Sequence, residues 1–176
     1  MEEVKTDMKK YLFTLLIILL AGLPSVVGAT SGEVSIGNHL RNAPMQGLTG
    51  KSEFLSLYLG KPLIINVWAS YCGPCLAEMG SLERLWQRHG EQFNVIGISI
   101  DDYPDRAEIF LARAGTTFPH YIDRQLMLEN MLGAKTIPLT LLIDAEGKVL
   151  KKVRGAQEWD SPEIIETIGK IYKIEM

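Results

Sequence analysis

Val67-Trp68-Ala69-Ser70-Tyr71-Cys72-Gly73-Pro74-Cys75 is the strongest indication of fold in this 176-residue chain, and it contains both of its cysteines. An apolar run over residues 63–68 leads into it and is typical of a buried strand. An amphipathic pattern over residues 76–88 follows it and is typical of a helix. Two thiols at a helix start can close into a disulfide and open again. The positive end of the helix favours the thiolate of Cys72, the nucleophile in disulfide exchange.

Two other uses of the cysteine pair can be weighed. A static disulfide between Cys72 and Cys75 would close a very short loop, where stabilisation through chain entropy is least. Half of a zinc site would need further ligands, and the histidines are scattered along the chain at His39, His89 and His120. We therefore predict a redox-active pair, and we expect no metal ion and no cofactor.

The N-terminal 29 residues have the pattern of an export signal. Lys9 and Lys10 precede an uncharged apolar run, and Val27-Gly28-Ala29 has the small-residue spacing of a cleavage site. An uncleaved membrane anchor is the alternative, because about 20 apolar residues span a bilayer. Either interpretation predicts a domain outside the cytoplasmic membrane. The formal net charge of −3 does not favour a nucleic-acid partner.

Strand and helix patterns alternate along the rest of the chain. We predict a linker over residues 30–39 and one α/β domain with a mixed sheet over residues 40–176. The predicted strands are 62–68, 93–100, 118–122, 139–144 and 148–154. The predicted helices are 52–59 with Ser52 as N-cap, 76–88, 104–114, 124–132, and a last one capped by Asp160. The cysteines then lie at the carboxyl end of a central strand, where open α/β sheets place their sites.

Residues 67–75 closely resemble the thioredoxin signature, in which Trp usually stands where this chain has Tyr71. Thr136-Ile137-Pro138 lies just before a predicted strand, where thioredoxin folds carry a cis-proline that faces the disulfide. Cis peptide bonds are essentially confined to X-Pro, although an ordinary trans proline could also begin an edge strand. The resemblance implies a thioredoxin fold, with a central mixed β-sheet flanked by helices.

The chain exceeds a minimal thioredoxin in three ways: the export signal, an N-terminal extension, and an inserted helix at residues 104–114. These additions resemble the exported, often membrane-tethered TlpA/ResA-like thioredoxins. This resemblance implies a thiol-disulfide oxidoreductase in which Cys72 attacks a substrate disulfide and Cys75 resolves the mixed disulfide. Gly73 and Pro74 between the cysteines, with Ile137 before the proline, resemble reducing members of the family.

Further residues are expected to contact the substrate. The resemblance implies that Ile137 and Pro138 hold the substrate chain by extended pairing. Trp68 and Tyr71 would line the approach, with packing in the core as the alternative for Trp68. The expected partners are disulfide-containing proteins and a membrane electron-transfer protein that re-reduces the pair. Related proteins reduce apocytochrome c, copper-site assembly factors or misoxidised proteins.

One buried acid of thioredoxins is replaced here. Thioredoxins often carry an Asp six residues before the first cysteine, and this chain has Asn66, which cannot take up a proton. Glu78 lies one helical turn after Cys75, where TlpA/ResA-like proteins often have a glutamate. We hypothesise that Glu78 accepts the Cys75 proton as a catalytic carboxylate. The alternative is that Glu78 only complements the helix dipole from the solvent side.

Two functions from other classes remain open. Two thiolates suit Cu(I), so a copper-binding chaperone is one alternative. Its distal histidine would have to be His120, which we expect on the surface. A thiol peroxidase with Cys72 as the peroxidatic cysteine is the other, although that class places Pro and Thr or Ser ahead of a single cysteine.

Overall fold

The apolar run ahead of the cysteines forms the central strand β3 (Leu63–Trp68), in which all six residues are buried. It pairs in parallel with β4 (Asn94–Ser99) and antiparallel with β6 (Leu139–Ile143).

The computed structural model describes residues 32–176, so the predicted signal or anchor over residues 1–29 lies outside the described residues. Within residues 32–176, no helix has the length and apolar character needed to cross a membrane.

Seven strands form one mixed sheet, which confirms the predicted architecture. The strand order is β2-β1-β5-β4-β3-β6-β7. The other strands are β1 (Pro44–Gly47), β5 (His120–Ile122), and the two edge strands β2 (Glu53–Phe54) and β7 (Val149–Arg154). The parallel strands β3, β4 and β5 end at the same edge of the sheet, the edge where the chain enters the cysteine motif.

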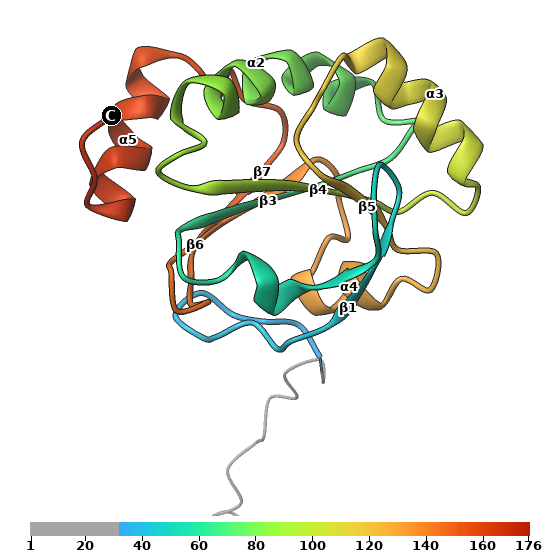
Figure 1. Ribbon diagram of the computed structural model, residues 1–176, viewed down its shortest axis with the longest axis horizontal. Coiled ribbons are helices and arrows are strands. Elements are labelled where there is room, and N and C mark those ends of the chain that lie inside the picture. Colours follow the sequence, from blue (N-terminus) through green and yellow to red (C-terminus); the bar gives the residue numbers. More distant parts are fainter. Residues whose placement is uncertain (1–31) are drawn as a thin grey trace, which may run out of the picture. The chain divides into compact units, whose positions relative to one another are not determined.

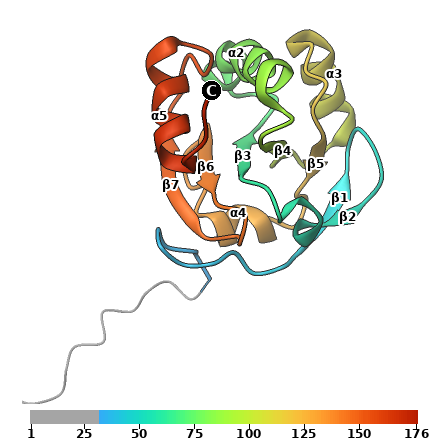
Figure 2. The same cartoon turned by 60° about the vertical axis from the view of Figure 1, so that its left-hand side comes forward.

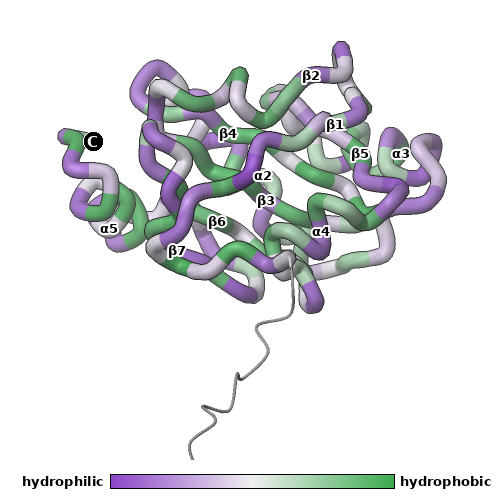
Figure 3. Tube along the Cα trace, turned by 90° about the horizontal axis from the view of Figure 1, so that it is seen from below, coloured by the Kyte–Doolittle hydropathy of each residue, from purple (hydrophilic) through white to green (hydrophobic). Residues whose placement is uncertain are grey.

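Helices cover both faces of the sheet. In Figure 1, α2 (Gly73–His89) and α3 (Pro104–Ala114) lie above the sheet and α4 (Met127–Leu132) lies below it. The last helix, α5 (Pro162–Tyr172), belongs with α2 to the same hydrophobic cluster, and Figure 2 shows the helices from a second side. Figure 3 shows hydrophobic colouring along the central strands, as expected of strands covered on both faces.

The helix predicted over residues 52–59 is wrong. Residues 53–54 form β2, and a 3-10 helix, η1 (Leu55–Tyr58), follows. The Ser52 hydroxyl does not cap a helix but accepts a hydrogen bond from Gly47 N–H at 3.1 Å. Leu55 N–H donates to the Ala43 carbonyl at 2.9 Å. The backbone is therefore occupied by pairing with the preceding strand, and tertiary pairing overrides the local helical pattern.

Three helix starts also differ from the prediction, and the first is α2, which begins at Gly73 and not at residue 76. The helix predicted from residue 124 begins at Met127, because the Asp123 carboxylate accepts the N–H groups of Met127 and Glu129 at 3.0 and 2.7 Å. The cap of α5 is Ser161, whose hydroxyl accepts from Ile164 N–H, and not Asp160.

Residues 32–39 pack against the sheet and α4, which differs from the linker expected over residues 30–39. Val34 is buried, and its N–H donates to the Met131 carbonyl at 2.8 Å. Gly37 N–H donates to the Val149 carbonyl at 2.8 Å, and Glu33 pairs with the buried amine of Lys152 at 2.9 Å. Residues 32–39 accordingly belong to the same compact unit as the rest of residues 32–176.

Candidate active site

The two cysteines have unequal positions at the start of α2. Cys72 is the N-cap residue, with an extended backbone, and its Sγ accepts the N–H of Cys75 at 3.2 Å. Cys72 is 7% exposed and Cys75 is fully buried. The pair is closed as a disulfide with a Cα–Cα distance of 5.3 Å. An attacking group can therefore meet Cys72 first, and the helix N-terminus stabilises a thiolate there.

The peptide bond between Ile137 and Pro138 is cis, as predicted. Pro138 immediately precedes β6, whose antiparallel register sets Leu139 against Val67 of β3. The proline consequently lies beside the end of β3, where the chain turns toward Cys72. Ile137 is half-buried and packs against the hydrophobic cluster that contains both cysteines.

The structure separates the predicted substrate-contacting residues into two groups. Tyr71, Gly73 and Pro74 are exposed around Cys72, with Tyr71 at 73%. Trp68 is fully buried and stacks on Phe110, with ring centroids 4.6 Å apart. Trp68 therefore cannot line the approach, because its ring points into the core under α3; the packing alternative is the correct one.

Glu78 is a buried carboxylate, 1% exposed. Its Oε1 accepts from Asn66 Nδ2 at 2.7 Å, and its Oε2 accepts from Gln157 N–H at 3.1 Å and from Trp159 Nε1 at 3.0 Å. Burial raises the pKa of Glu78, although these hydrogen bonds favour the charged form and partly offset it. The solvent-side alternative is therefore wrong.

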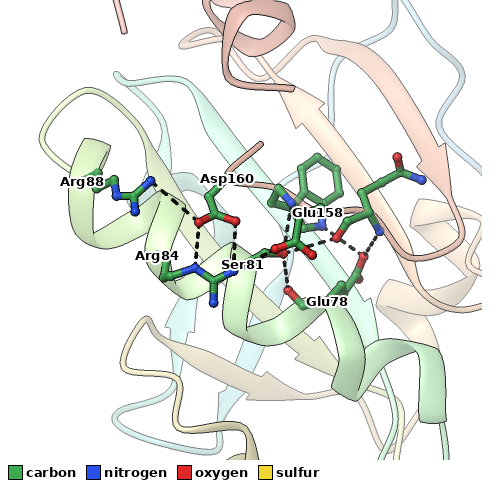
Figure 4. A network of polar contacts seen from close by, with 8 residues as sticks. Glu78, Ser81, Arg84, Arg88, Glu158 and Asp160 are labelled. Atoms are coloured by element: carbon green, nitrogen blue, oxygen red, sulfur yellow. Dashed lines mark hydrogen bonds and ion pairs between the residues drawn. The ribbon is translucent and has the colours of Figure 1, made fainter. Parts of the chain in front are cut away.

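Figure 4 shows why Glu78 is covered: the segment between β7 and α5 crosses over α2. Ser81 Oγ accepts Trp159 N–H at 3.0 Å, and Arg84 Nε pairs with Asp160 at 2.7 Å. Asp160, the residue expected to cap α5, thus connects this segment to α2 through an ion pair. Local sequence patterns do not reveal these contacts, because the partners lie 76 to 81 residues apart in the chain.

His120 is in the core, so the expectation that it lies on the surface is wrong. Its ring packs edge-on against Trp68 at 5.6 Å, and its Nε2 bonds with the Thr116 hydroxyl at 2.9 Å. Burial lowers the pKa of His120 to about 3. Among residues 32–176, no three or more His, Cys, Asp or Glu side chains gather where they could hold a metal ion.

A buried acid at the neighbouring strand end was also missed. Asp101 is 3% exposed and bonds with Ser70, two residues before Cys72. The sequence indicates Asp101 by its place: it is a polar residue directly after the predicted apolar strand 93–100, at the sheet edge where Cys72 lies.

A reachable cysteine at a helix N-cap, a buried partner cysteine and an adjoining cis-proline on this sheet define a thioredoxin-fold thiol-disulfide oxidoreductase. The chain belongs to the Redoxin family, whose model matches residues 35–168.

The relatives carry the same activity in their names. Thiol-disulfide oxidoreductase ResA of Geobacillus thermodenitrificans is 32% identical over 146 residues, which cover 80% of this chain and 84% of that one. ResA of Halalkalibacterium halodurans is 29% identical over 140 residues, covering 79% and 78%. A Chlorobium tepidum structure described as thiol:disulfide interchange protein DsbE has a TM-score of 0.72 at 26% identity, covering 79% of this chain and 99% of that one.

Proposed function

We propose that this thiol-disulfide oxidoreductase is a reductase of disulfide bonds in proteins outside the cytoplasm. The observation that carries the proposal is the asymmetry of the dithiol, with Cys72 reachable at the N-cap of α2 and Cys75 fully buried. Such a pair divides the reaction into attack by one sulfur and release by the other.

In the first step, the Cys72 thiolate attacks one sulfur of the substrate disulfide. The substrate S–S bond breaks, a mixed disulfide forms with Cys72, and the leaving substrate thiolate takes a proton from water. Tyr71, Gly73 and Pro74 are exposed around Cys72 and would contact the substrate. The backbone beside Pro138 would hold the substrate chain in an extended conformation.

In the second step, Cys75 loses its proton and attacks Cys72 Sγ. The mixed disulfide breaks, the second substrate sulfur leaves as a thiolate that takes a proton from water, and the Cys72–Cys75 disulfide forms. We assign the proton to Glu78, one helical turn from Cys75, because its raised pKa lets a buried carboxylate accept a proton nearer neutral pH.

The direction and the location rest on resemblance and on the predicted export signal. Gly73-Pro74 between the cysteines and Ile137 before the cis-proline resemble reducing members, and the pattern of residues 1–29 favours export or a membrane tether. A reductant in an oxidising compartment must be re-reduced, which we assign to a membrane electron-transfer protein. Cytochrome c maturation and copper-site assembly are the processes in which we expect its substrates.

Insulin reduction tests the proposal. With a chemical reductant present, the purified chain should accelerate cleavage of the insulin interchain disulfides. Cys72→Ser should fall to the uncatalysed rate, whereas Cys75→Ser should accumulate a mixed disulfide through Cys72. Wild type without activity, or Cys72→Ser with full activity, would overturn the proposal. Mixed disulfides trapped by Cys75→Ser in cells would identify the substrates and their compartment.

A further inference from the structure

Asp101 is a buried carboxylate that the reaction described so far does not use. It follows β4 by two residues and is 3% exposed. Its Oδ2 accepts Ser70 N–H at 2.8 Å and the Ser99 hydroxyl at 2.7 Å, and its Oδ1 accepts the Ser70 hydroxyl at 2.6 Å. Three donors therefore converge on one side chain at the sheet edge that carries Cys72.

These bonds act on the turn that presents the nucleophile. The pairing of β3 with β4 ends at Trp68 and Ser99, and Ile100 N–H then bonds to the Trp68 carbonyl at 3.0 Å. Beyond that point, Ser70 is bonded to Asp101, and Cys72 N–H closes the turn on the Ala69 carbonyl at 3.1 Å. The position of Cys72 relative to the sheet thus depends on the contact between Ser70 and Asp101.

The donors to Asp101 are all neutral. None of the ion pairs among residues 32–176 includes Asp101. A buried carboxylate without a cation is costly, and its field extends further than that of a solvated charge, because nearby water does not screen it. A second consequence is that this negative charge opposes the positive N-terminus of α2 on which Cys72 lies.

We propose that Asp101 is a positioning residue for Cys72: it fixes the turn that carries the nucleophile, and its charge disfavours the Cys72 thiolate and so keeps the pair reducing. A thiolate that is strongly stabilised makes a dithiol an oxidant, because the reduced form gains stability. A carboxylate beside the dithiol acts in the opposite direction. Only this second part, the reducing direction, rests on the function proposed above.

The neighbouring residue already responds to this field. The pKa of Tyr71 is raised, mainly by partial desolvation and then by the charges of Asp101, Asp102 and Glu129. Asp102 follows Asp101 on the same loop but is exposed, and Glu129 lies on α4 and is half-buried. Buried Glu78 on α2 and buried Asp123, whose N–H donates to the Ser99 carbonyl at 2.8 Å, are further carboxylates of this region. Arg124 is a cation beside the same loop, because its Nε donates to the Asp102 carbonyl at 3.1 Å.

The pH dependence of Cys72 alkylation separates charge from geometry. In Asp101→Asn, the amide can keep the three contacts, since its oxygen accepts from Ser70 N–H and Ser99 while its NH2 donates to the Ser70 hydroxyl. We expect the alkylation midpoint of the reduced full-length chain to fall by about 0.5 to 1 pH unit. The matched control, Asp102→Asn, removes an exposed charge one residue away and should shift the midpoint less. Equal shifts of the alkylation midpoint in the two variants, or no shift in Asp101→Asn, would overturn the proposal that the charge of Asp101 disfavours the Cys72 thiolate.

Equilibration with glutathione, at a pH above the alkylation midpoint, gives a second readout. At a given ratio of reduced to oxidised glutathione, the ratio of reduced to oxidised protein should be about threefold to tenfold higher in Asp101→Asn than in wild type. This corresponds to a reduction potential roughly 15 to 30 mV more oxidising. A purely structural role of Asp101 would leave this equilibrium unchanged, and an unchanged equilibrium would contradict the proposal.

Ser70→Ala tests positioning while leaving the charge in place. It removes one of the two bonds from the turn, so kcat/KM for a disulfide substrate should fall about threefold to tenfold with the alkylation midpoint unchanged. An unaltered kcat/KM would overturn the positioning part, even if Asp101→Asn failed to fold. Alkylation and glutathione equilibration measure Cys72 itself, so their outcome is independent of whether the protein reduces exported substrates.

Discussion

Among single residues, Glu78 is a carboxylate of α2 whose charged form is disfavoured by burial. Its carboxylate has three neutral donors and no exposure to water that would solvate a charge. Hydrogen bonds to a carboxylate favour its charged form, but burial opposes it more strongly here, and the pKa is raised. A group balanced in this way can take up and return a proton during turnover, which a solvated glutamate at pH 7 does poorly.

Glu78→Gln should slow the second step of the reaction. The amide keeps the side-chain volume, and the Asn66 amide can turn so that its oxygen accepts the new NH2, so the protein should fold. Since general bases contribute about 100-fold or more, we expect the release of a mixed disulfide by Cys75 to slow at least tenfold at pH 7. Single-turnover kinetics from pH 5 to 9 measure this.

The control for this variant is Glu91→Gln, which removes an exposed carboxylate beyond the end of α2. Its rate profile should match wild type. A Glu78→Gln profile that also matches wild type would remove Glu78 from the mechanism and leave it a structural role.

At the level of elements, β4 and β5 approach closely because one position lacks a side chain. Gly97 of β4 stands opposite His120 of β5. A Cβ at Gly97 would collide with the His120 ring and with Trp68 Nε1. The glycine therefore makes room for two rings between the sheet and α3, and the strand gives up β-propensity at this position to do so.

Gly97→Ala should consequently destabilise the protein. Overpacking a well-packed core costs about 1–3 kcal/mol, and we expect the upper part of that range because both rings are buried. Gly80→Ala is the matched control: its Cβ would meet only the flexible end of Arg84, and an alanine within α2 should add about 0.5–1 kcal/mol of stability. Urea unfolding measures the free energy of unfolding of both variants. Equal changes in Gly97→Ala and Gly80→Ala would show that the His120 ring can move aside.

For the whole molecule, two buried titratable groups give opposite pH dependences of stability. His120 has a folded-state pKa of about 3, below its unfolded value near 6.5, so the unfolded chain binds the extra proton and stability is lost as pH falls through this window. Glu78 has a raised pKa, so the folded chain holds its proton more tightly, and stability is lost as pH rises above about 4.5. The two effects therefore oppose each other from about pH 4.5 upward.

Variants separate these contributions. In Glu78→Gln, only the His120 effect remains in this window, and the free energy of unfolding should rise with pH by up to about 1.4 kcal/mol per unit. In His120→Gln, which can still bond with Thr116, this rise should disappear. Urea denaturation at half-unit steps from pH 5 to 7 measures both slopes, and a rise that persists in His120→Gln would show that another group titrates.

Much of the site could be predicted from local sequence. The cysteine motif and the helix that follows it are visible in a few adjacent residues, and the resemblance to thioredoxins implied the cis bond before Pro138. Errors arose where a polar residue had two possible partners. Ser52 and Asp160 both have side chains that can cap a helix, but Ser52 closes the turn after β1 and Asp160 pairs with Arg84.

The alternation of strands and helices and the place of the dithiol can be read from the amino-acid sequence, because hydrophobic periods, prolines and glycines act within a few residues. The surroundings of the sulfurs cannot, because they come from packing between distant segments. Ser70 and Asp101 lie 31 residues apart in the chain, and Glu78 and Trp159 lie 81 apart. The physical reason is that burial, which sets the pKa of Glu78, exists only once the sheet, α2 and the segment before α5 have packed together.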